Sequence, residues 1–571
     1  MYISGKQTSL RKHNMKHFIT VLQFDDIFPD EEKLAAAEYL KRISTKNLLS
    51  LVGFCNTTPL PNYYNFFSNP RTQKEIERRV NISSRRSDLQ ASRAETISPY
   101  SVLKIAEIIF SDPEILKADK TDTSDDEELD LFKAFLVING EYNTFEHDLS
   151  PEGNEGFINF QILQSFQLSE LSLHQDDQSE FGKLLYVTIY KIEELLRFLN
   201  AHHLLPLKSK FLQSFNVKSE HQLLYEMKYL FGLLMAGRAN NRFIYDVKSI
   251  EKLDLLENLI VQEISTDEDF TDLKKYPIYR IDETTISVIN YHYAIDLFYR
   301  SAKFRLKDIY NSEADYVKKY GDFFSYFNKR FSEEFLMKNL LDSIFEKKYF
   351  HKKKEFVKEQ ENEPDYYVRY NNAIYLFENK DVLISKGVKA SRSIQPIFDF
   401  LRQKFFLNKK KKVGIQQLIF SIKQIVDNEF PFDDGANKKQ NFEIFPVLIV
   451  HDRILQAPGI NYILNKWFKE ELRNTIDIDF NKNRIHNLTL IDIDTLITWE
   501  PHIKNKISSF KKLLLSHSDK ISRTKFNHKN IEDFTDKISK LLTPISLRAT
   551  PFFIDKKKFM DKFETLRNKT N

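Results

Sequence analysis

The stretch 363–380 constrains the fold of this chain more than any other part of its sequence. It holds two apolar-rich runs, 366–370 and 373–378, which are separated only by Asn371-Asn372. Asparagine tolerates positive φ better than most residues, so this pair suits a tight turn. The sequence therefore predicts a β-hairpin, with a Pro-Asp pair before its first strand and Glu-Asn-Lys at the end of its second.

A second apolar run, 442–450, is dense enough to form a strand that is buried on both faces. Helical patterns at 394–407, 413–426 and 460–473 surround it, and the run that begins at Leu488 predicts a further strand. Alternating helices and strands of this kind are typical of an α/β fold. We therefore expect an α/β domain over 330–515, with a mixed sheet flanked by helices.

The chain before this domain is predicted to be mainly α-helical, because apolar residues recur there with helical spacing. Two short β-prone runs at 278–291 predict a second hairpin. We expect five regions along the 571 residues. They are a helical N-terminal region (1–119), a second helical region (127–270), a connector of β-hairpin plus helix (271–329), the α/β domain (330–515) and a basic helical tail (516–571).

Composition excludes several classes of protein. The only cysteine, Cys55, cannot form an intramolecular disulfide or a cysteine-based zinc cluster. No apolar run reaches the ~18 residues needed to span a bilayer, and no secretory signal is evident, so a cytoplasmic protein is expected. The sequence also lacks a G-x-x-x-x-G-K-[S/T] phosphate loop and a G-x-G-x-x-G turn, which argues against a built-in ATPase motor or a dinucleotide-dependent dehydrogenase. With a net charge of only +4, any nucleic-acid surface has to be local.

Asp365 and Glu378 lie at nearly equal distances along the chain from the Asn371-Asn372 turn. The two carboxylates should therefore face each other at the open end of the hairpin. Carboxylate pairs bind hard cations such as Mg²⁺, which prefer oxygen ligands and retain several waters. Such a metal polarises a phosphate and lowers the pKa of an attacking water. The pair predicts a site for Mg²⁺ or Mn²⁺.

Lys380 shares a face of its strand with Glu378, because side chains alternate along a strand. Asn379 points to the opposite face with Tyr375 and Phe377, which we expect to be the side that faces the core. An ammonium group beside the cation can stabilise negative charge on a phosphate in the transition state. The alternative is that the two carboxylates and the lysine form an ordinary solvated salt bridge.

The motifs Pro364-Asp365 and Glu378-Asn379-Lys380 resemble the metal-binding hairpin of the PD-(D/E)xK nuclease superfamily, which has the restriction-endonuclease-like fold. The resemblance covers about 330–515. It implies a metal-dependent endonuclease with Asp365, Glu378 and Lys380 as catalytic residues, and with the main-chain carbonyl of Asn379 as a further metal ligand. DNA is a more natural substrate than RNA, and defence against phage or plasmids is the context suggested by analogy. Partners would be nucleic acid, a separate ATPase or sensor protein, and a second copy of the chain, but no membrane.

The superfamily often has a supporting glutamate in its first helix and a supporting glutamine in a later one. Glu333 and Gln416 are the candidates here. Ser332 is expected to cap the helix that carries Glu333. The alternative for Glu333 is that it merely complements the dipole in the first turn of that helix.

Basic residues after the motif could bind phosphates of the nucleic-acid backbone. The candidates are Lys386, Lys389, Arg392, Lys409, Lys410, Lys411 and Lys412. For 409–412, a solvated loop between helices is the alternative. His451-Asp452 could take part in acid–base chemistry or simply form a turn at the end of a strand.

Two questions stay open from the sequence. In the superfamily, another strand usually precedes the "PD" strand. In this chain that strand is short, is absent, or is supplied by the hairpin at 278–291. The function could also be that of a catalytically inactive nuclease fold, which binds nucleic acid or protein within a larger complex, or that of a modification or RNA-processing enzyme.

Overall fold

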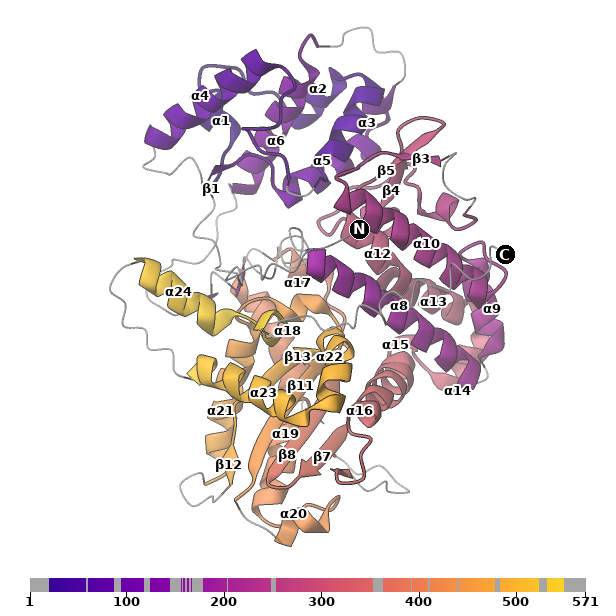
Figure 1. The fold of residues 1–571 in the computed structure, drawn as a ribbon, viewed down its shortest axis with the longest axis vertical. Helices are drawn as coiled ribbons and strands as arrows, with labels where there is room; N and C mark the ends of the chain where they lie inside the picture. Colours follow the sequence, from indigo (N-terminus) through magenta and orange to yellow (C-terminus); the bar gives the residue numbers. More distant parts are fainter. Residues whose placement is uncertain are drawn as a thin grey trace, which may run out of the picture.

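A computed structural model describes residues 20–548, except 58–59, 87–93, 118–123, most of 144–177, 203, 248–252, 353–362, 392, 409–410, 439–440, 478–482 and 523–530. Helices and a mixed sheet make up the structure, as the expected α/β class requires. The N-terminal helices lie at one end of the long axis and the main sheet at the other (Figure 1). No helix in the described part of the chain is long and apolar enough to cross a membrane.

The N-terminal end is a bundle of short helices packed around one apolar core. Ser98 caps one of these helices, α5, by accepting a hydrogen bond from the Ser101 backbone N–H at 3.1 Å. Apolar side chains of 261–293 complete the same core, so a segment distant in sequence belongs to this bundle. The helices are α1 (Phe24–Ile27), α2 (Ala36–Lys41), α3 (Thr45–Phe54), α4 (Pro70–Arg86), α5 (Pro99–Ser111) and α6 (Glu127–Asn143).

The middle of the chain is helical apart from a small sheet. Strands β4 (Ile278–Arg280) and β5 (Thr285–Val288) pair antiparallel, which confirms the predicted hairpin, and β3 (Tyr245–Asp246) joins them. This sheet is separate from the main one. The helices of this part are α8 (Gln178–Ala201), α9 (Leu205–Gln213), α10 (Glu220–Ala239), α11 (Thr271–Lys275), α12 (Tyr291–Asp296), η5 (Leu297–Ser301), α13 (Ala302–Ser312), α14 (Ala314–Tyr320), α15 (Phe323–Phe327), η6 (Asn328–Met337) and α16 (Lys338–Ile344).

The predicted hairpin of the C-terminal half forms the centre of the main sheet. Strand β7 (Tyr366–Tyr370) pairs antiparallel with β8 (Ala373–Lys380), and β8 pairs parallel with β11 (Glu443–Val450). The strand order is β12-β11-β8-β7-β6, and β13 (Thr489–Asp492) also pairs with β11. The outer strands β6 (His351–Lys352) and β12 (Arg484–Ile485) are short. Among the described residues, the strand that precedes the "PD" strand is the short β6, and the hairpin at 278–291 belongs to a separate sheet.

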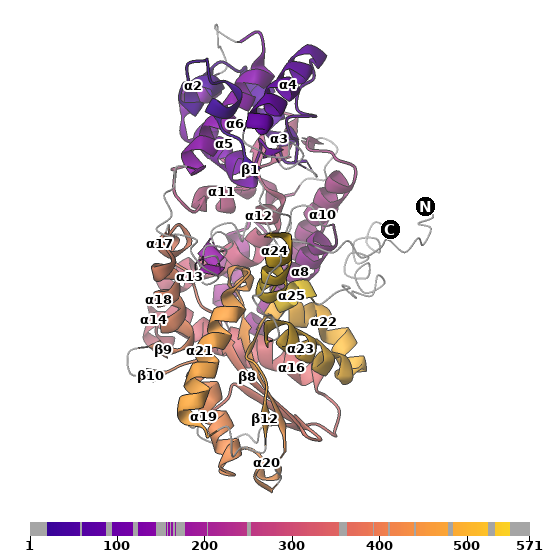
Figure 2. The same cartoon turned by 90° about the vertical axis from the view of Figure 1, so that its left-hand side faces the viewer.

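Helices cover both faces of this sheet (Figures 1 and 2). On one face, Tyr375 and Phe377 of β8 share a core with α16, α22 (Ile493–Asn505) and α23 (Ile507–Ser522). On the other face, Ile374 and Leu376 pack with α18 (Ile394–Phe405), α19 (Ile415–Val426) and α21 (Ile460–Thr475). The face with Tyr375 and Phe377 thus faces a core, as predicted, and the opposite face of β8 is covered as well. A parallel partner strand places β8 inside the sheet, where both faces are covered by helices.

The C-terminal helices pack on the same half of the molecule. Helix α23 begins before the expected start of the basic tail and continues into it, and α24 (Ile531–Leu542) and α25 (Ile545–Arg548) follow. Leu541 and Leu542 are buried in the core beneath α21, and Ile545 is buried in the core on the opposite face.

Candidate active site

The turn of the hairpin holds Asp365 opposite the end of β8. Asn371 has a φ of 53°, the left-handed conformation that asparagine tolerates. Tyr366 pairs with Phe377, and the Asp365 carboxylate accepts a hydrogen bond from the Asn379 backbone N–H at 2.7 Å. The predicted register is therefore present, and Asp365 lies within reach of the last residues of β8.

Glu378 is fully buried within the sheet. Its Oε1 accepts a hydrogen bond from the Lys380 ammonium at 2.7 Å, whereas its Oε2 is buried without a hydrogen-bond partner. Burial, followed by the nearby charge of Asp365, raises the pKa of Glu378 to about 8. A buried carboxylate oxygen with no donor is a position where a cation would satisfy an otherwise costly group.

Lys380 points to the same side of β8 as Glu378, as strand alternation predicts, and its side chain is 19% exposed. Burial lowers the pKa of Lys380, but the charges of Glu378 and Asp365 outweigh this effect and hold the pKa above its ordinary value. The side chain is therefore an ammonium at neutral pH. It can stabilise negative charge but cannot accept a proton in this state.

Glu333 lies on η6, close enough to Asp365 and Lys380 for their charges to act on it. Burial and then Asp365 raise the pKa of Glu333 to about 8. Helical structure already begins at Phe323, so Ser332 is inside a continuous helical stretch and does not cap it. Glu333 is consequently not in a first turn, and the dipole explanation does not apply to it.

The glutamine next to the site is Gln417 and not Gln416, so that choice was wrong. The Lys380 ammonium lies 3.4 Å from Gln417 Oε1, which also accepts a hydrogen bond from the Gly414 backbone N–H at 2.7 Å. Gln416 instead lies 3.5 Å from Glu471 on α21. Gly414 has a φ of 52° and starts α19, so the turn that begins the helix decides which glutamine faces the strand.

Asp381 forms a buried network next to the site that the sequence did not predict. Its carboxylate accepts hydrogen bonds from the Lys303 ammonium at 2.7 Å and from the Ser332 hydroxyl at 2.5 Å. The Asn328 side chain donates to the Asp381 backbone carbonyl at 2.7 Å. Because Ser332 precedes Glu333 and Asp381 follows Lys380, this network fixes η6 relative to the end of β8.

His451 lies at the end of β11 and supports the hairpin from the opposite face. Its Nε2 is 2.8 Å from Asn379 Oδ1, and its Nδ1 is buried without a hydrogen-bond partner. Burial lowers the pKa of His451 to about 4, so the ring is neutral at physiological pH. Asp452 Oδ1 accepts from the Ile454 backbone N–H at 3.1 Å and caps η7 (Arg453–Gln456). Of the two interpretations, this geometry favours a structural role at the strand end.

Four of the seven predicted phosphate-binding residues are in the described part of the chain, and they lie on two different elements. Lys386 and Lys389 lie on α17 (Lys386–Lys389) and form ion pairs with Asp267 at 2.6 Å and Asp269 at 3.0 Å. Lys411 and Lys412 form the short strand β10 (Lys411–Lys412), which pairs with β9 (Leu407–Asn408). Arg392, Lys409 and Lys410 lie outside the described residues.

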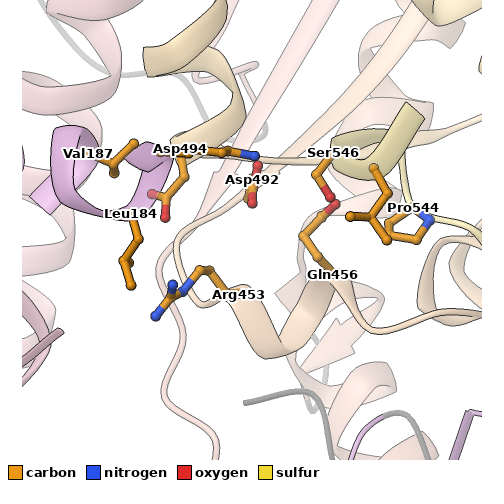
Figure 3. Close-up of a pocket in the computed structure, with 10 residues that line it drawn as sticks. Leu184, Val187, Arg453, Gln456, Asp492, Asp494, Pro544 and Ser546 are labelled. Atoms are coloured by element: carbon orange, nitrogen blue, oxygen red, sulfur yellow. The ribbon is translucent and has the colours of Figure 1, made fainter. Parts of the chain in front are cut away.

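A second group of carboxylates has a structural role. Asp492 and Asp494 line a small pocket of about 30 Å³ at the start of α22, together with Gln456 and Ser546 (Figure 3). Asp492 caps α22 by accepting from the Thr495 backbone N–H at 2.9 Å, and Asp494 forms an ion pair with Lys191 of α8. The volume suits a water molecule rather than a substrate.

The described residues include no group of three or more His, Cys, Asp or Glu that could hold a metal ion. Mg²⁺ in enzymes commonly takes only one or two carboxylates and keeps several waters. Asp365 and the buried Oε2 of Glu378, which has no hydrogen-bond partner, fit such a cation. The carboxyl of Glu333 is close enough for the charge of Asp365 to act on it.

Comparison of the chain with protein-family models, with curated proteins and with solved structures gave no match. The case for a function consequently rests on the residues and topology of this chain.

Proposed function

We propose that the C-terminal half is a metal-dependent nuclease of the restriction-endonuclease-like type, and that it hydrolyses phosphodiester bonds in DNA. The observation that carries this proposal is the convergence of Asp365, Glu378 and Lys380 at one end of β8, beside Glu333 and Gln417. These groups come from a hairpin, a preceding helix and a following helix. A sheet order that places the hairpin beside a parallel strand supports the same proposal.

Asp365 and Glu378 would hold Mg²⁺ or Mn²⁺, with the main-chain carbonyl of Asn379 as a further ligand. When bound, the cation supplies Lewis-acid polarisation of the phosphate and a water of lowered pKa. Glu333 is poised to orient a water by hydrogen bonding from its partly buried position.

Lys380 would stabilise the negative charge that builds up on the phosphate oxygens as the bond to the attacking water forms. Its ammonium now donates to Glu378 Oε1 at 2.7 Å. Gln417 Oε1, 3.4 Å from the same ammonium, is the group that would keep Lys380 in place once the Glu378 carboxylate is shared with a cation.

The test is cleavage of supercoiled plasmid, linear duplex, single-stranded DNA and RNA by the purified chain in Mg²⁺ or Mn²⁺. Asp365→Ala and Lys380→Ala should each lower the rate at least about 100-fold, since the first removes a metal ligand and the second removes the ammonium that stabilises charge on the phosphate. Lys352→Ala is the matched control, because Lys352 is a lysine of the same sheet that pairs with Asp342 at 2.8 Å. It should cleave at the wild-type rate.

Full activity in the Lys380→Ala protein would remove Lys380 from the mechanism. Binding of nucleic acid without cleavage of any of the four substrates would favour the alternative, an inactive nuclease fold that serves as a binding module.

A further inference from the structure

A cavity of about 550 Å³ lies between the middle helical region and the C-terminal half, outside the candidate active site. Its walls come from three parts of the chain: the helices α11 to α13, the segment 383–389 that follows β8, and the segment 452–454 that follows β11. Figure 2 shows α11, α12 and α17 close together at this junction. The volume is within the ~300–1,000 Å³ range of ligand pockets. Carboxyl ends of parallel strands, such as β8 and β11, are common places for ligands.

The walls of the cavity carry an excess of positive charge. Seven Lys or Arg side chains line it, against four Asp. Two of the lysines, Lys274 and Lys389, share the single carboxylate of Asp269 at 2.7 and 3.0 Å. Arg300, Arg453 and Lys386 also form ion pairs, with Asp452, Asp296 and Asp267. The seven cations thus face five carboxylates when Asp267 is counted, and the remaining positive charge in a partly enclosed space favours an anionic ligand.

Arg305 provides a donor that the protein itself leaves unused. Its Nη1 donates to the Ser214 backbone carbonyl at 2.8 Å, but its Nε is buried and has no hydrogen-bond partner. Arg305 is among the residues that line the cavity, and its guanidinium also lies 4.7 Å from the centroid of the Phe215 ring. Guanidinium groups bind phosphate through their N–H donors and keep their charge at all physiological pH values, so Arg305 adds a permanent positive charge to this wall of the cavity.

The cavity also has aromatic and apolar walls. Phe304 lines it and is 40% exposed, which is unusual for a phenylalanine in a folded protein. Tyr293 and the buried side chains of Leu297, Ile384 and Ile454 line it as well. A planar heterocyclic base stacks well on an exposed aromatic ring.

We propose that this cavity binds a free nucleotide, with its phosphates on Arg305, Lys275 and Lys386 and its base on Phe304. The proposal goes beyond the proposed nuclease activity and does not depend on it, because none of Asp365, Glu378 and Lys380 lines the cavity. A nucleotide that belongs to a DNA or RNA strand has the same chemistry, so the experiment has to separate the two sources.

The probe is ATP, titrated by calorimetry into the full-length chain in EDTA, so that no metal–nucleotide complex can bind at the hairpin. Adenosine and inorganic tripolyphosphate test the base and the phosphates separately, and both should bind at least tenfold more weakly than ATP. Phe304→Ala and Lys386→Ala should each weaken ATP binding about tenfold. This corresponds to ~1.4 kcal/mol, a typical value for one stacking or charged contact.

Lys33→Ala is a matched control for Lys386→Ala. The Lys33 side chain is 48% exposed and pairs with Asp25 at 3.0 Å, whereas that of Lys386 is 53% exposed and pairs with Asp267 at 2.6 Å. Lys33 is in the N-terminal bundle, so its substitution should leave ATP binding unchanged.

Absence of ATP binding at millimolar concentration would overturn the proposal, as would binding that neither cavity variant weakens. Binding of a twelve-residue oligothymidylate but not of ATP would also overturn it, because the cavity would then belong to a path for a nucleic-acid strand. The Asp365→Ala protein should bind ATP as the wild type does. The cleavage assay tests the nuclease proposal and the ATP titration tests the nucleotide site, so the failure of one proposal can be distinguished from the failure of the other.

Discussion

At the scale of single residues, the candidate site is a buried cluster of carboxyl groups that opposes folding in the absence of metal. Burial, and then the charge of Asp365, raise the pKa values of Glu333 and Glu378 to about 8, compared with an ordinary value of 4.5. At pH values between 4.5 and 8, these two carboxyl groups are protonated in the folded protein but ionised in the unfolded chain. The free energy of unfolding should therefore decrease as pH rises from about 4.5 to about 8, because the folded state must then carry buried charge.

We predict that the metal-free protein loses stability between pH 6.5 and 8, by on the order of 1 kcal/mol per pH unit for each such carboxyl. Urea unfolding in EDTA measures this change. Glu378→Gln should flatten the pH dependence and make the protein more stable than the wild type at pH 8, while abolishing cleavage. Mn²⁺ should restore the stability of the wild type but not raise that of Glu378→Gln. An unchanged pH dependence in the variant would contradict the assignment of a buried, protonated Glu378.

At the scale of elements, one carboxylate connects three parts of the chain around the candidate site. Asp381 follows β8, Ser332 lies on η6 and Lys303 on α13, and the side chains of Asp381 and Lys303 are each only 7% exposed. Lys380 directly precedes Asp381 in the chain, and Glu333 directly follows Ser332. The network therefore sets the distance between the candidate catalytic strand and the helix that brings Glu333.

Asp381→Ala should lower the free energy of unfolding by about 3–5 kcal/mol, since removal of one partner leaves the Lys303 ammonium buried without its counter-charge. Asp427→Ala is the control, because Asp427 pairs with Lys423 at 2.6 Å on the exposed side of α19 and should change stability by less than about 1 kcal/mol. Equal effects of the two substitutions in urea unfolding would show that the Asp381 network has no special role.

At the scale of the whole molecule, the expected boundary at residue 330 passes through a shared core. One apolar cluster combines helices α8, α9, α10, α12, α13, α15 and α16 with the sheet and with α22 and α23. The rings of Phe198 and Phe331 lie 5.3 Å apart, and the ion pair between Lys191 and Asp494 joins α8 to α22. The α/β part therefore depends on helices that precede it by more than a hundred residues.

A fragment that starts at residue 330 should consequently lack a cooperative unfolding transition, whereas the full chain should show one. Thermal and urea unfolding followed by circular dichroism make this comparison. A fragment 330–548 that unfolds cooperatively and cleaves DNA would show that the α/β part is an independent domain.

The hairpin could be predicted from the sequence because its determinants are local. The Asn371-Asn372 turn and the period of two along β8 place Asp365 opposite Glu378 and put Lys380 on the side of Glu378, whatever the rest of the chain does. The strand 442–450 and most of the later helices could be predicted for the same reason, since each has its own apolar pattern.

Contacts between elements that are far apart in sequence could be learned only from the tertiary structure. The turn at Gly414 places Gln417, and not Gln416, next to the strand. The packing of α13 and η6 brings Lys303 and Ser332 to Asp381. The parallel pairing of β8 with β11 buries Glu378 on a covered face of the sheet. A residue pattern carries the period of its own element, but not the rotation and translation at which that element meets another. The sequence alone therefore determined which groups the hairpin offers, and the tertiary structure determined how deeply they are buried and which neighbours surround them.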